Sequence, residues 1–410
     1  MPVRKWMLTR RVLGQAGAAT ALAAVVGRPA RADRPYRIGA LNPITGAGST
    51  YGSGMQKTIL FALEEVKRAG GVDGRPIEVY AEDTQTSPDA AVLAARKLID
   101  ANKVDAIIGT WSSSVSLAVL PITNEANCLL LHTSSAPALS TPAQNPKHLA
   151  WRFQAASHQI GDAYAAIAAH EKASRAAAMA FNNDVQIASV GFFRSAWEKA
   201  GGKLPNPVVY EPNRTSYAAE LQQALSEKPD FLVVSGYVPD TSIILREAYE
   251  AGNTAKIVIP GWAMGPATVK ALGAEVLEGL IVVDAVPDAG SAAFKTFDAA
   301  YRAATGNPGS SNIYAAMCYD MVAVLTLAMQ KAGPSADNAA IAQVIPEVAN
   351  PPGQAVSSFA EGRKLLQAGQ KINYEGASGP IDFDERGDVT PVFGVSVFHD
   401  GKLEQRYLLK

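Results

Sequence analysis

Short apolar runs alternate with stretches of helical periodicity along this chain, and this alternation constrains the fold more than any other feature. The first run, YRIGAL at residues 36–41, is followed by a glycine-rich loop and a helical pattern over residues 55–69. The same order returns at PIEVYAED and VDAIIG, and later at AAAMAF, FLVVSG, KIVIPG and GLIVVDAV. Repeated strand–helix–strand units predict an α/β fold with parallel sheets, in which ligands bind outside the carboxyl ends of the strands.

The length of the chain indicates how many lobes it forms, and its charge indicates which partners it disfavours. The chain has 410 residues, more than one hydrophobic core usually supports, so we expect two lobes. Its formal net charge is -1, and its body has no dense basic run. There is therefore no electrostatic reason to expect nucleic acid as a partner.

Residues 1–32 read as a secretory signal peptide. They combine a basic start, an apolar segment over residues 12–26, and small residues at Ala30 and Ala32. Residues 9–13 (TRRVL) resemble the twin-arginine export motif, while an ordinary Sec signal or an uncleaved anchor remains the alternative. We find no second apolar run of this kind, and we expect a soluble periplasmic protein, cleaved after Ala32.

The chain has two cysteines, Cys128 and Cys318. An oxidising compartment would allow them to pair. Both lie in apolar surroundings, NCLLL and AAMCYDMV, which favours two buried free thiols over a disulfide.

Three consecutive serines, Ser112, Ser113 and Ser114, follow the apolar run VDAIIG and precede a helical pattern. Free backbone N–H groups and the positive end of the helix dipole meet at such a point, which suits a carboxylate. The alternative is that a serine here only caps its helix.

A second hydroxyl cluster follows the next strand, CLLL, and consists of Thr133, Ser134 and Ser135. Because both clusters follow the carboxyl ends of adjacent parallel strands, we expect them to lie at the same edge of the sheet. Convergent polar groups at such an edge are typical of a small-ligand site.

On these residues the chain resembles the type I periplasmic solute-binding proteins of ABC transporters, specifically the leucine/isoleucine/valine-binding family. The resemblance is carried by TGAGSTYGSGMQ, EEVKRAGGVDGRPIEVYAEDTQTSP, IIGTWSSS, HTSSAPALS, PDFLVVSGY, the segment from Pro260 to Gly273, and YEGASGPIDFDERGD. It implies two Rossmann-like lobes that close on a ligand and are joined by a hinge of three crossings, near Gln154, Ala285 and Asn373. Lobe 1 would comprise residues 36–153 and 286–372, and lobe 2 residues 154–285 and 373–410.

The resemblance also implies roles for individual residues. Ser112 matches the serine that holds the ligand carboxylate, and Thr133 would offer its carbonyl to a ligand ammonium. Ser135 stands where the family uses a threonine that touches both ends of an amino acid. Tyr51 would close over the ligand, and Tyr237 would reach it from the second lobe, although a tyrosine at a strand end is also common packing.

One departure from the family affects the ligand. Where amino-acid binders supply a glutamate for the ammonium, this chain has Gly261 or Trp262. Burying an ammonium without a partner charge is costly. Either the ligand has no ammonium, or another acid takes over, the candidates being Asp184, Asp240 and Asp284.

Aromatic residues stand in place of that charge, and together they predict a carboxylate with an apolar or aromatic body. We therefore favour aromatic, oxo or hydroxy acids, although a tryptophan could instead fill the core. The aromatic candidates are Tyr51, Trp111, Tyr237 and Trp262, with Phe181 and His132 as further options.

No enzyme signature is present. The loop GAGSTYG fails the dinucleotide fingerprint at Tyr51, no G-x-S-x-G frames Ser112, and the five histidines lack metal-ligand spacing. We expect no catalytic residues, no cofactor and no metal. The expected function is that of an exported, monomeric binding protein that delivers a small carboxylate to a membrane permease. The alternatives are a branched-chain amino acid or amide as ligand, and a ligand-sensing module of the same fold.

Overall fold

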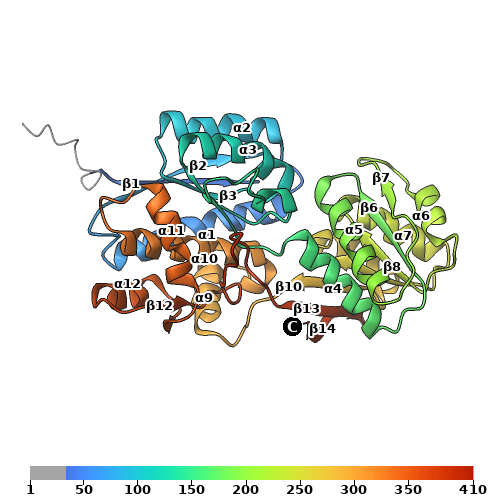
Figure 1. Cartoon of the computed structure of the whole chain (residues 1–410). Helices are drawn as coiled ribbons and strands as arrows, with labels where there is room; N and C mark the ends of the chain where they lie inside the picture. Colours follow the sequence, from blue (N-terminus) through green and yellow to red (C-terminus); the bar gives the residue numbers. More distant parts are fainter. Residues whose placement is uncertain (1–33, 410) are drawn as a thin grey trace, which may run out of the picture.

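The computed structural model describes residues 34–409, except for the side chains of residues 266 and 267, so the predicted signal peptide lies outside the described residues. Two lobes lie side by side, each built on its own sheet (Figure 1). Chain segments pass between them, so neither lobe is made of one continuous piece of sequence.

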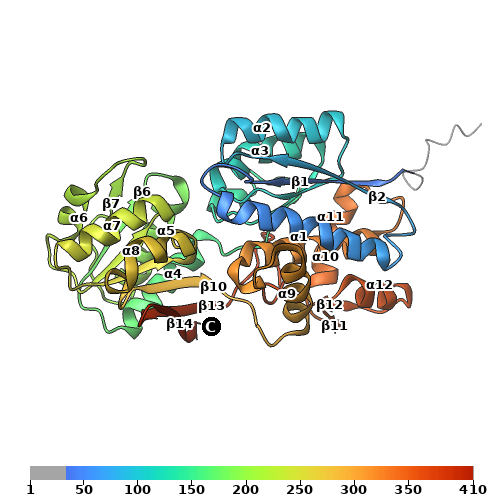
Figure 2. The same cartoon turned by 180° about the vertical axis from the view of Figure 1, so that it is seen from behind.

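The first lobe contains a five-stranded parallel sheet in the order β2-β1-β3-β4-β5. Helices α2 and α3 cover one of its faces, and α1, α9 and α10 lie on the other side (Figure 2). Its strands are β1 (Tyr36–Asn42), β2 (Ile77–Asp83), β3 (Ala106–Gly109), β4 (Leu129–His132) and β5 (Ala150–Arg152), with a small pair β11 (Gln354–Val356) and β12 (Ile372–Tyr374). Its helices are α1 (Ser49–Arg68), α2 (Pro88–Arg96), α3 (Ser113–Ala126), α9 (Ala292–Thr305), α10 (Ile313–Ala332), α11 (Asn338–Ala349) and α12 (Phe359–Gln367).

The second lobe contains a seven-stranded sheet in the order β14-β13-β10-β9-β8-β6-β7. It is parallel from β10 to β7, and the hairpin β13–β14 adds antiparallel strands beside β10. The strands are β6 (Ala176–Phe181), β7 (Val208–Tyr210), β8 (Phe231–Ser235), β9 (Lys256–Pro260), β10 (Ile281–Ala285), β13 (Phe393–His399) and β14 (Lys402–Leu409). The helices are α4 (Ser157–His170), α5 (Asp184–Lys199), α6 (Ala218–Leu225), α7 (Val238–Glu250) and α8 (Pro266–Leu277).

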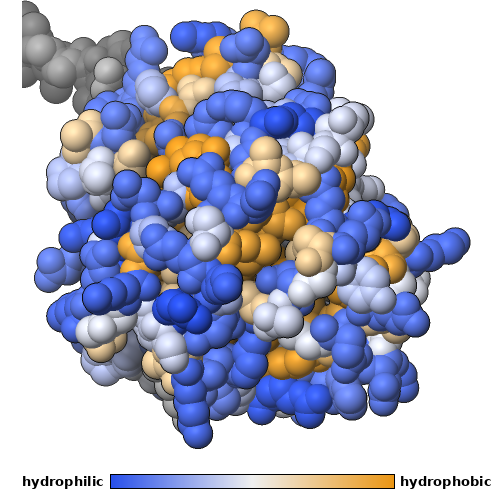
Figure 3. Space-filling model, turned by 90° about the vertical axis from the view of Figure 1, so that its right-hand side faces the viewer, coloured by the Kyte–Doolittle hydropathy of each residue, from blue (hydrophilic) through white to orange (hydrophobic). Residues whose placement is uncertain are grey.

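The apolar runs form strands where the sequence predicts them, and the parallel α/β class is confirmed. Strands β3 and β4 are buried at every residue, because helices cover both faces of the parallel sheet. The first helix begins earlier than expected, at Ser49, and ends at Arg68 just before the Gly70–Gly71 pair. The outward face of the second lobe is mostly hydrophilic, with apolar side chains set among polar ones (Figure 3).

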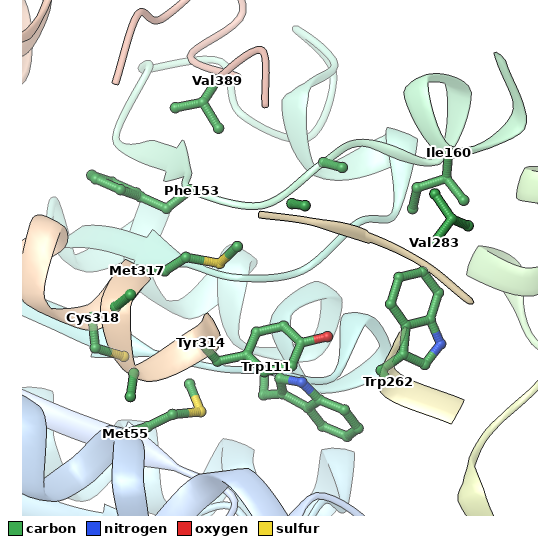
Figure 4. Packing of buried hydrophobic residues seen from close by; sticks show 14 of the residues in the cluster. Met55, Trp111, Phe153, Ile160, Trp262, Val283, Tyr314, Met317, Cys318 and Val389 are labelled. Carbon is green, nitrogen blue, oxygen red and sulfur yellow. The ribbon is translucent and has the colours of Figure 1, made fainter. Parts of the chain in front are cut away.

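Helix α10 corrects the expectation that the body of the chain contains no further long apolar run. It is long and apolar enough to cross a membrane, but 89% of its apolar window is buried inside the fold, as in the core helix of a soluble protein. Cys318 lies on this helix, beside Met317 and above Met55 in Figure 4. Cys318 and Cys128 are both free and buried, as predicted, and burial raises the pKa of each thiol.

The last crossing between the lobes differs from the expectation near Asn373. Strand β12 pairs with β11 in the first lobe, and the Glu375 N–H donates to the carbonyl of Val356 at 2.9 Å. The chain stays in the first lobe through Asp388, which pairs with Arg152. It crosses to the second lobe just before β13, where the Val286 N–H donates to the carbonyl of Val392 at 2.9 Å. The β11–β12 pairing keeps this segment in the first lobe.

Arg152, the last residue of strand β5, forms an ion pair with Asp388 in the segment just before this last crossing between the lobes. Its side chain is fully buried, and its Nε donates to Asp388 Oδ1 at 2.8 Å. The guanidinium also donates to the carbonyl of Ser134, to the carbonyl of Ala136 at 2.9 Å, and to the hydroxyl of Ser140 at 2.6 Å. A buried charge with this many partners is stable only while the set is complete.

We predict that Arg152→Met lowers the free energy of unfolding by about 3–5 kcal/mol, because it leaves Asp388 buried without its cation. The matched control is Arg194→Met, which removes an exposed i,i+4 pair with Glu198 and should cost at most ~0.5 kcal/mol. Urea denaturation followed by circular dichroism measures both. Equal losses in the two variants would contradict this role of Arg152.

Candidate functional site

A narrow cleft between the lobes contains most of the predicted binding residues. Its free volume is about 30 Å³, room for about two water molecules and far below the roughly 300–1,000 Å³ typical of small-molecule sites. The lobes must therefore move apart to admit a ligand with even a single ring. The cleft is lined by Trp111, Ser112, Ser113, Thr133, Ser135, Val185, Gln186, Tyr237, Trp262 and Tyr314.

Ser112 lies directly before helix α3, with φ -75° and ψ 135°, but its side chain does not cap the helix. Within residues 34–409 the hydroxyl bonds only to the hydroxyl of Ser114, at 3.0 Å, and the residue lines the cleft. The first N–H groups of an α-helix have no partner within the helix, and the helix dipole is positive there. This end of α3 therefore presents donors to the cleft.

Ser113 joins the ends of the two central strands. Its hydroxyl oxygen accepts hydrogen bonds from the N–H groups of Ser135, at 3.1 Å, and Ala136, at 3.2 Å. These bonds fix the loop after β4 against the start of α3. The two hydroxyl clusters predicted to share one sheet edge are thus directly connected.

Thr133 and Ser135 face the cleft from the loop after β4, whereas Ser134 does not. Thr133 is 2% exposed, and its hydroxyl has no hydrogen-bond partner among the described residues. The hydroxyl of Ser134 instead contacts the carbonyls of Thr110, at 2.9 Å, and Trp111, at 3.1 Å. The side chain of Ser134 therefore points away from the cleft, because successive side chains of an extended segment point to opposite sides, and its role in ligand binding stays a prediction.

Four aromatic rings meet beside the cleft and connect the lobes, although Tyr51 itself does not line the cleft. Trp111 lies 5.8 Å from Tyr51, 5.8 Å from Tyr314 and 6.0 Å from Tyr237 of the second lobe, measured between ring centroids. The Tyr51 hydroxyl donates to the carbonyl of Met264 in the second lobe at 3.3 Å. The structure is therefore a closed form.

Trp262 approaches from the second lobe, on a short 3-10 helix after β9 (Gly261–Ala263). Figure 4 shows it across from the adjacent rings of Trp111 and Tyr314. Both tryptophans are largely buried, with Trp111 7% and Trp262 8% exposed, and both line the cleft.

The remaining aromatic candidates lie outside the cleft wall. The Phe181 ring packs behind Tyr237, with centroids 5.1 Å apart. His132 is buried in β4, and its Nδ1 accepts from the Ser134 N–H at 3.2 Å. Burial lowers the pKa of His132 well below its usual value, so it stays neutral.

Two of the three acid candidates are placed elsewhere. Asp184 is exposed at the start of α5. Asp240 is buried behind Tyr237, accepting from the Tyr237 N–H at 3.2 Å and from the hydroxyl of Tyr210. Its carboxyl group already has partners within the second lobe.

Asp284, the third acid, lies against Gly261. A Cβ atom placed on Gly261 would be 2.1 Å from Asp284 Oδ2, so the carboxyl group fills the space of a side chain at position 261. Burial raises the pKa of Asp284 to about 7. Neither Gly261 nor Asp284 lines the closed cleft, although their neighbour Trp262 does.

Sequence reasoning missed Tyr314, Gln186 and Val185. Tyr314 belongs to α10, far along the chain, and only the fold brings it beside Trp111. Gln186 is 1% exposed, and its side-chain oxygen has no partner among the described residues. Its position in the first turn of α5, after the strand AAAMAF, is the signal that could have indicated it.

One group of side chains elsewhere has ligand atoms close enough to share a cation. Glu278, His399 and Asp400 are all exposed, on the second lobe. His399 Nδ1 lies 2.7 Å from Glu278 Oε1, so the two side chains already pair with each other. This exposed cluster lies outside the cleft.

The sequence model of the periplasmic binding protein family matches residues 35–398, so the chain belongs to this family. It is similar to the leucine-, isoleucine-, valine-, threonine-, and alanine-binding protein of Pseudomonas aeruginosa, with 24% identity over 375 residues and 91% of each chain covered. Among solved structures, it is similar to the leucine-binding protein LivK from Thermotoga maritima, with a TM-score of 0.78, 26% identity, and 91% of this chain and 98% of that chain covered. A solute-binding protein from R. palustris in complex with 4-hydroxybenzoate gives a TM-score of 0.76 at 16% identity, covering 92% of this chain and 97% of that one. That last likeness shows the fold alone.

Fold and family together define the class. The architecture is the type I periplasmic binding protein fold, and the chain is a periplasmic solute-binding protein of the ABC-transporter type. Proteins of this family bind small molecules and work with membrane permeases.

We predict that Ser113→Ala lowers the free energy of unfolding by about 1–3 kcal/mol, because two buried N–H groups lose their acceptor. Ser114→Ala is the control, since this serine is exposed, and it should stay within ~0.5 kcal/mol of the wild type. Urea denaturation of both variants checks the difference. A loss in Ser114→Ala as large as that in Ser113→Ala would contradict the assignment.

Proposed function

We propose that this protein captures a small carboxylate with an aromatic, oxo or hydroxy body in the cleft and delivers it to a membrane permease. The observation that carries the proposal is the Thr133 hydroxyl, which is buried in the cleft wall without a partner among the described residues. A buried polar group without a hydrogen bond costs free energy, which a ligand oxygen would recover.

A carboxylate fits the polar wall of the cleft. The N–H groups at the start of α3 and the hydroxyls of Ser112, Thr133 and Ser135 come from neighbouring strand ends. Hydrogen bonds to a charged acceptor are stronger than neutral ones. The donors and the helix dipole together favour an anion at this wall.

Rings from both lobes suit a flat apolar body. Trp111 and Tyr314 of the first lobe line the cleft together with Tyr237, Trp262 and Val185 of the second. None of the described residues that line the cleft is charged, so an ammonium would find no counter-ion at the wall. This supports an acid without an amino group.

Ligand-driven closing would connect binding to transport. The cross-lobe contacts of Tyr51 with Met264 and of Trp111 with Tyr237 exist only when the lobes are closed. A ligand that touches both walls stabilises this form and shifts the population toward it. The permease would then recognise the closed form of the monomer.

A branched-chain amino acid or amide is the second candidate, favoured by the names of the similar proteins from Pseudomonas aeruginosa and Thermotoga maritima. The unpartnered oxygen of Gln186 would be an acceptor for an amino or amide group. The two candidates differ in whether the ligand carries a positive charge.

We predict that benzoate and 4-hydroxybenzoate raise the melting temperature of the purified protein, whereas leucine and the uncharged analogue benzamide do not. A ligand that binds only the folded form stabilises it according to its concentration over Kd. A thermal-shift assay measures all four compounds under one condition. Stabilisation by leucine without any effect of the benzoates would refute the proposed ligand class.

We predict that Ser112→Ala weakens binding of 4-hydroxybenzoate roughly tenfold to a hundredfold, because a hydrogen bond to a charged group is lost. The control is Ser195→Ala, an exposed serine on α5 outside the cleft wall, which should bind as the wild type does. Isothermal titration calorimetry gives the two Kd values. Unchanged affinity in Ser112→Ala would show that this serine does not hold the carboxylate.

A further inference from the structure

Gly261 and Asp284 form a matched pair directly beside Trp262, which lines the cleft. Only a glycine at position 261 leaves room for the Asp284 carboxyl group, since an added Cβ would lie 2.1 Å from Oδ2. The two residues belong to neighbouring strand ends, because β9 and β10 run parallel in the same sheet. The absence of a side chain at Gly261 is therefore directly connected to the presence of an acid beside it.

The Asp284 carboxyl group has an unused oxygen. Oδ1 accepts a hydrogen bond from the Ala285 N–H at 2.9 Å, whereas no hydrogen bond to Oδ2 is found among the described residues. Part of the Asp284 residue is exposed to solvent, but protein atoms closely surround its carboxyl group. This crowding favours the neutral form of the acid.

The titratable groups that face Asp284 come from three helices of both lobes. They are the phenols of Tyr51 on α1, Tyr164 on α4 and Tyr314 on α10, whose pKa values are all raised, first by burial and also by the Asp284 charge. These phenols stay neutral near pH 7. Directly after β9 and on β13, the neighbouring residues are Gly261 and Gly394, which carry no charge.

Given the carboxylate ligand proposed above, on which this inference rests, we propose that neutral Asp284 is a second recognition point of the cleft. It donates a hydrogen bond to a hydroxyl or carbonyl oxygen at the end of the ligand opposite the carboxylate, from the space that a side chain at position 261 would otherwise fill. The preferred ligand class is then an acid with a second, uncharged oxygen.

This proposal predicts the sign of the pH dependence. In the closed form without ligand, burial raises the pKa of Asp284 to about 7, so near neutral pH both forms are populated. A ligand that binds the neutral form, and brings its own negative charge, raises this pKa and takes up a proton. Affinity is therefore full below the free-state pKa and falls as the pH rises through it. An ammonium-bearing ligand would prefer ionised Asp284 and show the opposite slope.

Calorimetric titration with 4-hydroxybenzoate at pH 6 and pH 8 tests this in the unmodified protein. We expect Kd to increase about tenfold between these pH values. Titrations at pH 7 in two buffers of different ionisation enthalpy should show uptake of about half a proton per ligand. Affinity that is unchanged or that increases with pH would overturn the proposal.

Two variants separate Asp284 from other titrating groups. Asp284→Asn keeps the shape and the donor of the neutral acid, so it should bind with the low-pH affinity at both pH values. Asp184→Asn, the same change at the exposed acid on α5, should retain the wild-type pH dependence. A pH dependence that persists in Asp284→Asn would contradict the assignment.

The ligand class is tested by comparing 4-hydroxybenzoate with benzoate at pH 6. The wild type should prefer the hydroxylated acid about tenfold, and Asp284→Ala should lose this preference. Equal affinities in the wild type would refute the second recognition point. If neither acid binds at any pH, the proposed carboxylate function itself fails, which is a distinct result.

Discussion

The buried guanidinium of Arg152 is the interaction on which the geometry of the cleft depends. It is the largest fully buried side chain of the described residues, and its charge is balanced by Asp388 and by the carbonyls of Ser134 and Ala136. Those carbonyls belong to the loop that carries the cleft hydroxyls, while Asp388 lies just before the last crossing between the lobes. One desolvated charge thus fixes the polar wall of the site and attaches it to the hinge region, because each partner is needed to offset the cost of burial.

The two lobes contribute different chemical groups to the cleft. The first lobe supplies backbone N–H groups and hydroxyls at parallel strand ends, which suit an anion, as well as the rings of Trp111 and Tyr314. The second lobe supplies the rings of Tyr237 and Trp262, with Val185 and Gln186. In the closed form the lobes meet through aromatic contacts and through the hydrogen bond between Tyr51 and Met264, while Ser157 at the start of α4 donates to the carbonyl of Ser135 near the hinge. A ligand that contacts both lobes would add to these contacts and raise the population of the closed state.

Much of this could be predicted from the sequence, because strands with apolar runs and hydroxyls at their ends are local signals. The position of Ser112 at a helix start is one such signal. The side chain of Ser134 points into the protein because side chains alternate along an extended segment, and the sequence prediction did not take this alternation into account. The place of Tyr314, the late crossing beyond Asn373 and the filling of the Gly261 gap by Asp284 could not be predicted, because each depends on contacts between segments distant in the chain.

We propose that the polar wall holds a ligand carboxylate, and a crystal structure of the protein grown with 4-hydroxybenzoate would locate it. We expect the carboxylate within hydrogen-bond distance of the start of α3 and of the Thr133 hydroxyl, with the ring between Trp111 and Trp262. A ligand bound with its carboxylate toward Trp262, or outside the cleft, would contradict this binding mode.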